Sequence, residues 1–271
     1  MTTKLLLLSA FCISDTLPRR GAFWGGVGVG YGLIYALPAA TWYKWREAQG
    51  WRFFNDGLEW RQMDKLGHVW TTYHLSLLIR EWAKKNGYSQ RQAYRMGGSL
   101  AWLFQLSIEA FDGFFPKWGA SLWDVAANTA GTALYMLSQA LQGSPWQVGM
   151  RFSFHPTPYA KQKPHLLGRG VAQILKDYNG QTYWFCIFHR RSPIGLALGH
   201  GAEGLLGGYG QEPEATIRER ERRRWVLSVD PHWEVLFRKS HWFVRIFVSF
   251  KTPLPALVYV APKARFVWLY Y

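Results

Sequence analysis

Polar side chains recur at helical spacing inside otherwise apolar stretches of the first half of the chain. On a helix, residues three or four apart lie on the same face, so each stretch would present a short polar stripe. Carboxylates and an imidazole in such stripes can act as general acids and bases or bind a divalent cation. The members of this set are Asp64 with His68, Glu109 with Asp112, and Ser121 with Asp124 and Asn128.

We expect these residues to meet in one polar cluster, because an ionisable group without a partner in a dry environment is costly. Lys65 and His68 are the nearby donors for the four carboxylates of the set. That imbalance predicts either a raised carboxylate proton affinity or room for a cation. The cofactor therefore stays unknown, with a divalent cation as the one that this chemistry admits.

The cluster has an enzymatic and a structural interpretation. In an enzyme, His68 would be a general base or a metal ligand, and Glu109 and Asp124 would complete the catalytic set. Lys65 would neutralise a phosphate. In a structural cluster the groups would be closed off and paired with one another, with Ser121 as a helix cap. The supporting residues of the cluster are Asp64, Lys65, Asp112, Ser121 and Asn128.

Four apolar stretches must position these side chains, at residues 21–43, 66–79, 96–115 and 120–141. The first carries no charge and, at roughly 20 residues, is long enough to span a membrane as a helix. Small residues in the fourth suit close helix packing. We expect an antiparallel bundle of about four apolar helices, embedded in a membrane or lying against it. A soluble four-helix bundle is the alternative.

The chain changes character near residue 145. Asn179-Gly180 predicts a hairpin turn, and runs rich in Phe, Trp, Tyr and Val predict strands. The fold class is therefore α+β, with a helical domain at 15–145 followed by a β-rich domain at 146–271. The expected strands are 150–155, 181–189, 225–229, 242–250, 256–261 and 265–271.

Residues 1–14 have the features of a signal peptide. Lys4 precedes a short apolar run, and Cys12 and Ser14 are small residues placed for cleavage after residue 14. Phe11 stands directly before Cys12, where a lipoprotein signal needs a small residue. Cleavage would leave Cys186 as the only thiol and so exclude an internal disulfide.

The charge and the aromatic content favour a membrane surface. Lys and Arg number 32 against 17 Asp and Glu, a net charge of +15, and 16 residues are Trp. The chain lacks a recognition helix and an RNA-type aromatic motif, so we expect no nucleic-acid partner. Membrane lipids with anionic head groups are the expected partners, together with other envelope proteins. A mean hydropathy of −0.15 argues against a polytopic transporter.

The polar set also resembles a known family. The pattern is Asp64-Lys65-x-x-His68, then Glu109-x-x-Asp112, then Gly119-x-Ser121-x-x-Asp124-x-x-x-Asn128-x-x-Gly131. It is similar to the YfiM-like family of predicted periplasmic lipoproteins, a family of unknown function, over roughly residues 60–141. Residues 152–160 and 176–184 resemble the extended form found in Bacteroidetes-type bacteria. A looser similarity links the same motifs to VanZ-like membrane proteins.

These observations predict an uncharacterised membrane protein of the bacterial cell envelope with a structural or interaction role. The alternative is a membrane enzyme, metal-assisted or not, that acts on a lipid-linked or phosphorylated envelope substrate. Residues 80–95 hold five basic side chains and one acidic one, which places this link in the cytoplasm by the positive-inside rule. The polar cluster would then face the periplasm from the inner membrane, with the outer membrane as the second location. This orientation requires either that the signal peptide is uncleaved or that the four helices do not all span.

Overall fold

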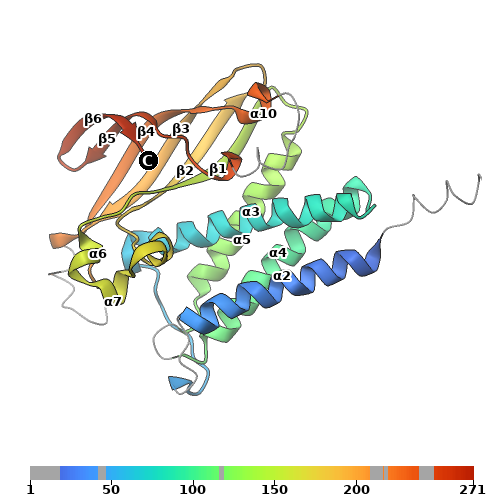
Figure 1. The fold of residues 1–271 in the computed structure, drawn as a ribbon, viewed down its shortest axis with the longest axis horizontal. Helices are drawn as coiled ribbons and strands as arrows, with labels where there is room; N and C mark the ends of the chain where they lie inside the picture. Colours follow the sequence, from blue (N-terminus) through green and yellow to red (C-terminus); the bar gives the residue numbers. More distant parts are fainter. Residues whose placement is uncertain (1–18, 42–46, 116–118, 208–215, 217–218, 238–246) are drawn as a thin grey trace, which may run out of the picture. The chain divides into compact units, whose positions relative to one another are not determined.

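The computed structural model describes residues 19–41, 47–115, 119–207, 216, 219–237 and 247–271. Long helices come first, and a sheet of six antiparallel strands follows (Figure 1). This order confirms the α+β expectation. The expected signal peptide at residues 1–14 lies outside the described residues. The long helices are α2 (Arg20–Thr41), α3 (Met63–Lys85), α4 (Gln90–Asp112) and α5 (Leu122–Ala140).

Local sequence signals explain where two of these helices start. Ser89 caps α4 in a capping box, because its side chain accepts from Gln92 N and the Gln92 side chain accepts from Ser89 N. Ser121 caps α5, accepting from the backbone N–H groups of Trp123 and Asp124. The predicted role of Ser121 as a helix cap is therefore confirmed.

No helix in the described part of the chain is long and apolar enough to cross a membrane. The expected span at residues 21–43 corresponds to α2, and that expectation is corrected. The helix contains six glycines, together with Trp24, Tyr31 and Tyr35. These residues add little to hydropathy, so the absence of charge does not by itself make the segment apolar enough.

The chain divides into two compact units. The first comprises the described residues up to 54 and residues 74–120, and the second comprises residues 55–73 and 121–271. Helix α3 contributes its second half to the first unit and its first half to the second. The core of the first unit gathers side chains from α2, α3 and α4: Phe23, Ile79, Ala83, Ala93 and Ala101.

The sheet belongs to the second unit, and each strand pairs with the next one along the chain. The strands are β1 (Trp146–Phe154), β2 (Gln181–His189), β3 (Ile194–Glu203), β4 (Arg222–Pro231), β5 (Leu254–Val260) and β6 (Lys263–Tyr270). β2 has the predicted bounds. Of the expected strand at 242–250, residues 242–246 lie outside the described residues, and residues 247–249 form a helical turn, so the prediction is wrong there.

Strand β3 was not predicted, because glycines interrupt its apolar pattern. The structure shows why they are needed. A Cβ on Gly199 would lie 2.8 Å from the ring of Trp184, and one on Gly201 would lie 2.6 Å from the guanidinium of Arg224. The glycines make room for two large side chains on the buried face of the sheet.

Asn179-Gly180 forms a turn, but the expected β1–β2 hairpin is wrong. The connection from β1 to β2 runs over residues 155–180 and contains α6 (Tyr159–Gln162), α7 (Pro164–Leu167) and α8 (Gln173–Lys176). Thr157 donates to Asp177 Oδ2 at 2.5 Å, and the Asn179 side chain donates to Asp177 Oδ1 at 2.8 Å. These bonds fix a long connection in place of a short turn.

The inner face of the sheet is a closed core. It holds Trp184, Cys186, Val226 and Val258, all 0–1% exposed. Tyr270 of β6 contacts the ring of Trp184 on β2 and lies 2.9 Å from the hydroxyl of Thr182. Because β6 and β2 are separated by three strands, the sheet must curl around this core.

Candidate functional site

An ammonium group bound by three carboxylates is the centre of the candidate site. Lys65 Nζ lies 2.6 Å from Asp56 Oδ2, 2.6 Å from Asp124 Oδ1 and 2.9 Å from Asp64 Oδ2. An ammonium carries three N–H donors, and each is directed to one carboxylate. All of these residues belong to the second unit.

Asp56 and the start of α3 are joined by an unusual turn. Trp60, Arg61 and Gln62, in the 3-10 segment η2 (Glu59–Gln62), have φ values of 51°, 52° and 63°. Successive left-handed residues other than glycine are strained and persist only where their surroundings hold them. Here Arg61 Nε lies 3.1 Å from Glu221, and Arg223 of β4 donates to the Arg61 carbonyl at 3.1 Å. The turn brings Asp56 back to Lys65.

The start of α5 supplies the third carboxylate. Ser121 Oγ accepts from Asp124 N at 3.2 Å and donates to Asp56 Oδ1 at 2.5 Å. One hydroxyl therefore caps the helix and links two of the carboxylates that bind Lys65. Asp124 lies in the first turn, where the helix dipole favours a negative charge.

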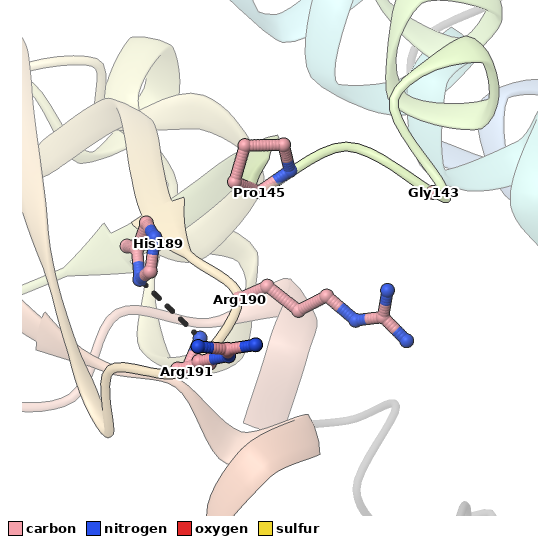
Figure 2. Close-up of a pocket in the computed structure, with 5 residues that line it drawn as sticks. All are labelled: Gly143, Pro145, His189, Arg190 and Arg191. Carbon is pink, nitrogen blue, oxygen red and sulfur yellow. Dashed lines mark hydrogen bonds between the residues drawn. The ribbon is translucent and has the colours of Figure 1, made fainter.

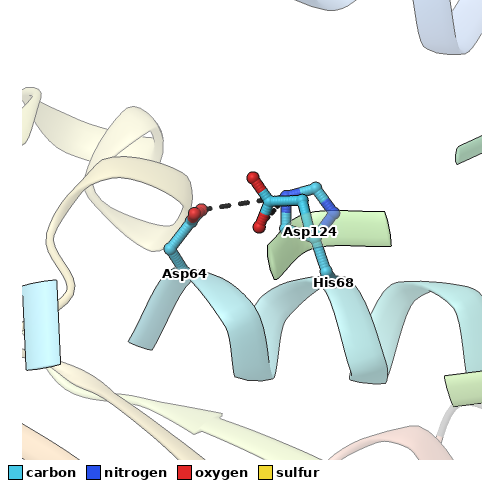
Figure 3. Close-up of side chains that lie close together, drawn as sticks. All are labelled: Asp64, His68 and Asp124. Carbon is cyan, nitrogen blue, oxygen red and sulfur yellow. Dashed lines mark ion pairs between the residues drawn. The ribbon is translucent and has the colours of Figure 1, made fainter. Parts of the chain in front are cut away.

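His68 lies one turn further along α3, close to Asp64 and Asp124 (Figure 3). Its Nδ1 lies 3.1 Å from Asn128 Oδ1, an acceptor, so Nδ1 carries a proton. Its Nε2 lies 3.5 Å from Asp124 Oδ1 and 3.9 Å from Asp64 Oδ1. In the neutral imidazole, Nε2 would carry no proton and would face carboxylate oxygens, which are also hydrogen-bond acceptors. This arrangement favours protonation of Nε2 or a cation bound between the imidazole and the carboxylates.

The pKa shifts of the cluster residues agree with an excess of negative charge around Lys65. Burial and the charge of Asp64 raise the pKa of Asp124 to about 7, because Lys65 and His68 offset only part of both effects. Burial would also raise the pKa of Asp64, but the charges of Lys65 and His68 outweigh it and hold that pKa below its ordinary value. Burial would lower the pKa of Lys65, but Asp64 and Asp124 raise it.

One of the comparisons with known proteins gives an assignment. Residues 48–140 match the family model described as Predicted periplasmic lipoprotein (DUF2279). The resemblance predicted from the polar motifs is therefore confirmed, with a start about 12 residues earlier than the motifs indicated. The match associates the chain with the cell envelope and assigns no activity. No curated protein and no solved structure matches the chain.

The DUF2279 segment contains every sequence-predicted site residue, but the residues fall in both compact units. Asp64, Lys65, His68, Ser121, Asp124 and Asn128 come together in the second unit as described above. Glu109 and Asp112 belong to the first unit, where Glu109 is buried near the end of α4 and Asp112 is the last residue of that helix.

Two contacts of the cluster have no helical spacing that would mark them in the sequence. Asp56 stands alone in a loop, without a helical spacing to mark it. Tyr178 lies outside the DUF2279 segment, in the motif at residues 176–184, and its hydroxyl donates to Asp64 Oδ1 at 3.0 Å. That motif belongs to the part of the sequence that resembles the extended family form. This resemblance is the sequence signal that points to Tyr178.

The ligand geometry of the cluster also suits a cation. One ligand atom each of Asp64, His68 and Asp124 lies within 4.8 Å of the others. Three carboxylates and one ammonium leave a formal charge of −2 when Asp124 is ionised. A proton on Asp124 or a bound cation would reduce this excess. A cation at the three ligands would meet the charge of Lys65, which already binds two of the same carboxylates.

The outer face of the sheet is a second candidate site, and it lies entirely outside the DUF2279 segment. Directly paired residues of neighbouring strands point to the same face, and the pairing Phe185–Leu198–Leu227–Leu257–Phe266 runs across five strands. We call this row the outer ladder. Its side chains are 39–57% exposed.

The outer ladder has apolar neighbours on both sides. Ile187, Leu196 and Val229 form a parallel row, and Trp225 pairs with Tyr259 on the other side. All of these side chains are exposed, at 38–52%. An exposed apolar surface that is continuous over several strands marks an interaction site. The strands other than β3 were predicted, but the sequence pattern did not show which of their faces is covered.

Proposed function

We propose that this chain is a structural or interaction protein of the bacterial cell envelope that lies on a membrane surface through the outer face of its sheet. The observation that carries this proposal is the outer ladder with its flanking rows. Contiguous exposed apolar side chains are unfavourable in water and are stabilised by contact with another apolar phase. The family match supports a location in the envelope.

Lipid is the partner whose chemistry fits this face. Trp225 and Tyr259 are of the types that concentrate at the membrane–water interface. Exposed basic residues lie at both ends of the strands, with Arg190 and Arg191 after β2 and Lys263 at the start of β6. Basic residues beside an apolar surface are attracted to anionic head groups, and the net charge of +15 acts in the same direction.

In this function the polar cluster is structural. Lys65 directs all of its donors to carboxylates, and Ser121 links Asp56 to the start of α5. The cluster therefore ties the left-handed turn, α3 and α5 together within the unit that carries the sheet. The pairing of Lys65 with three carboxylates supports this structural role.

The proposal is tested by sedimentation of the purified protein with phospholipid vesicles. We expect the wild-type protein to bind, and Leu227→Asp at the centre of the outer ladder to lower the affinity at least tenfold, as for a charge placed in an apolar interface. Leu103→Asp is the matched control, since Leu103 is 50% exposed on α4. Circular dichroism verifies that both variants are folded. Equal binding by wild type and both variants would contradict the proposal.

A second candidate function is an enzyme acting on a lipid-linked or phosphorylated envelope substrate. The observation that favours it is His68 Nε2 facing Asp124 Oδ1 at 3.5 Å, which places an imidazole and a carboxylate where a cation could be shared. Beside them lies a hollow of about 470 Å³, lined by Lys65 and by mostly apolar residues that include Leu66, Val69 and Trp123.

Metal analysis distinguishes this candidate from the structural one. If the cluster holds a divalent cation, the purified protein should bind Mn²⁺ or Zn²⁺ at one equivalent, and His68→Gln should lose it. His165→Gln is the control, because His165 is exposed and remote in sequence. Equal, weak binding by wild type and both variants would remove the metal-assisted enzyme from consideration.

A further inference from the structure

A basic hollow lies at one end of the sheet, beside the apolar outer face. It has a volume of about 650 Å³ and is lined by Gly143, Pro145, His189, Arg190 and Arg191. The turn from β2 to β3 supplies the basic residues, and the link between α5 and β1 supplies the other two. All five residues belong to the second unit. Figure 2 shows Arg190 extended from the turn, below the loop that carries Gly143 and Pro145.

The hollow is built by backbone contacts. Arg190 N donates to the carbonyl of Pro145 at 2.7 Å, which joins the turn to the α5–β1 link. Arg191 N donates to His189 Nδ1 at 3.4 Å. Because Nδ1 accepts, the neutral imidazole carries its proton on Nε2. The hollow therefore combines two guanidinium groups with a third N–H donor.

The positive charges of Arg190 and Arg191 are not neutralised by acidic residues in the lining of the hollow. No acidic residue is among the described residues that line it. Neither Arg190 nor Arg191 forms an ion pair with a described residue. Both arginines are exposed. Arginine guanidinium groups match phosphate oxygens in geometry and charge, so the chemistry of the hollow is that of a phosphate site.

The surroundings identify the kind of phosphate. Trp146 contacts the ring of His189 at 5.3 Å between centroids and is 54% exposed. Ile187 and Ile194, also exposed, lie on the outer face at the two ends of the turn. A molecule with a phosphate in the hollow would have its remaining part against these apolar side chains.

We propose that this hollow binds the phosphate of an anionic phospholipid head group while the outer face contacts the lipid chains. This rests on the proposed membrane binding and adds the chemistry of the lipid that is recognised. A glycerophospholipid with an anionic head group has both parts, the phosphate for the arginines and the apolar chains for the sheet. A soluble phosphate compound would use only the hollow.

The test compares binding of the full-length protein to neutral phosphatidylcholine vesicles and to vesicles that also contain phosphatidylglycerol. We expect tighter binding to the anionic vesicles. The double substitution Arg190→Gln/Arg191→Gln should lower that affinity roughly 25-fold, about a factor of five for each arginine. Binding to neutral vesicles should fall far less, because the choline ammonium of phosphatidylcholine offsets the charge of its phosphate. The control Arg91→Gln/Arg95→Gln removes the same charge from exposed positions of α4 and should have little effect.

Each other outcome contradicts a separate statement. Wild-type binding that is equal for both vesicle types would overturn the head-group site while leaving the outer face as a membrane contact. An equal loss in both double variants would show a diffuse charge effect and overturn the site. Saturable binding of inorganic phosphate to the free protein, lost in Arg190→Gln/Arg191→Gln, would reassign the hollow to a soluble anion. Absence of binding to either vesicle would overturn the proposed function itself.

Discussion

Lys65 near the start of α3 donates a hydrogen bond of 2.6 Å to Asp124 near the start of α5, across 59 residues of sequence. The same ammonium binds Asp56 and Asp64. Because Lys65 is 8% and Asp124 is 5% exposed, these charges are largely removed from water. Each partner is therefore needed to compensate the burial of the others.

Removing the ammonium should strongly destabilise the protein. Lys65→Met leaves three carboxylates without their cation, and we expect a loss of about 3–5 kcal/mol in the free energy of unfolding, as for a broken buried ion pair. Lys85→Met is the control, because Lys85 is exposed at the end of α3, and it should have little effect in the same urea titration. Similar losses in both variants would show that the cluster does not depend on Lys65.

The raised pKa of Asp124 predicts a pH dependence. Since its pKa is about 7 in the folded protein, the folded state binds a proton more tightly than the unfolded chain. Its contribution to stability is therefore fully present below about pH 4 and is lost as the pH rises to about 7.

Asp124→Asn removes this titration. The free energy of unfolding of the variant, relative to that of the wild type, should rise with pH between about pH 4 and about pH 7. The rise should be up to about 1.4 kcal/mol per pH unit, and the difference should then stay level. Urea denaturation at several pH values measures this difference. A difference that stays constant over this pH range would refute the raised pKa of Asp124.

Gly131 sets the distance between α3 and α5. A Cβ at this position would lie 2.6 Å from the carbonyl oxygen of Val69 and 2.9 Å from Thr72 Cβ. Gly131→Ala should therefore cost about 1–3 kcal/mol through overpacking. Gly28→Ala on α2, where the new methyl meets nothing within 4 Å, should instead stabilise by about 0.5–1 kcal/mol. A stabilising effect at both positions in thermal denaturation would contradict this contact.

A buried ionic group inside the sheet should also be essential for folding. Asp230 Oδ2 lies 2.5 Å from Arg151 Nε, and Asp230 Oδ1 lies 3.3 Å from Lys251 Nζ. Burial raises the pKa of Asp230 and lowers that of Lys251, although each has a partner of opposite charge. Asp230→Asn leaves two cations in the core and should cost about 3–5 kcal/mol. A loss no larger than that of Glu219→Gln, at an exposed side chain, would show that this ionic group is dispensable.

Much of the helical half could be predicted from local patterns. The apolar stretches located α2 to α5, and Ser121 was recognised as a cap because capping depends on residues three apart in sequence. The helical spacing of Asp64 with His68 and of Asp124 with Asn128 placed each pair on one face. Asp56 and Tyr178 could not be found in this way, because they join the cluster through a left-handed turn and a long loop.

Local patterns were enough to predict the helices, most of the strands, the basic and aromatic character and the family motifs, because these depend on composition and on spacings within single elements. Long-range contacts in the folded chain establish which polar residues meet Lys65 and explain why β3 needs its glycines. They also bury one face of the sheet and leave the outer ladder exposed. Apolar residues lie on both faces of these strands, so their alternation carries no information on burial. Which face is covered depends on how the sheet curls around Trp184, and that curl joins residues far apart in the chain.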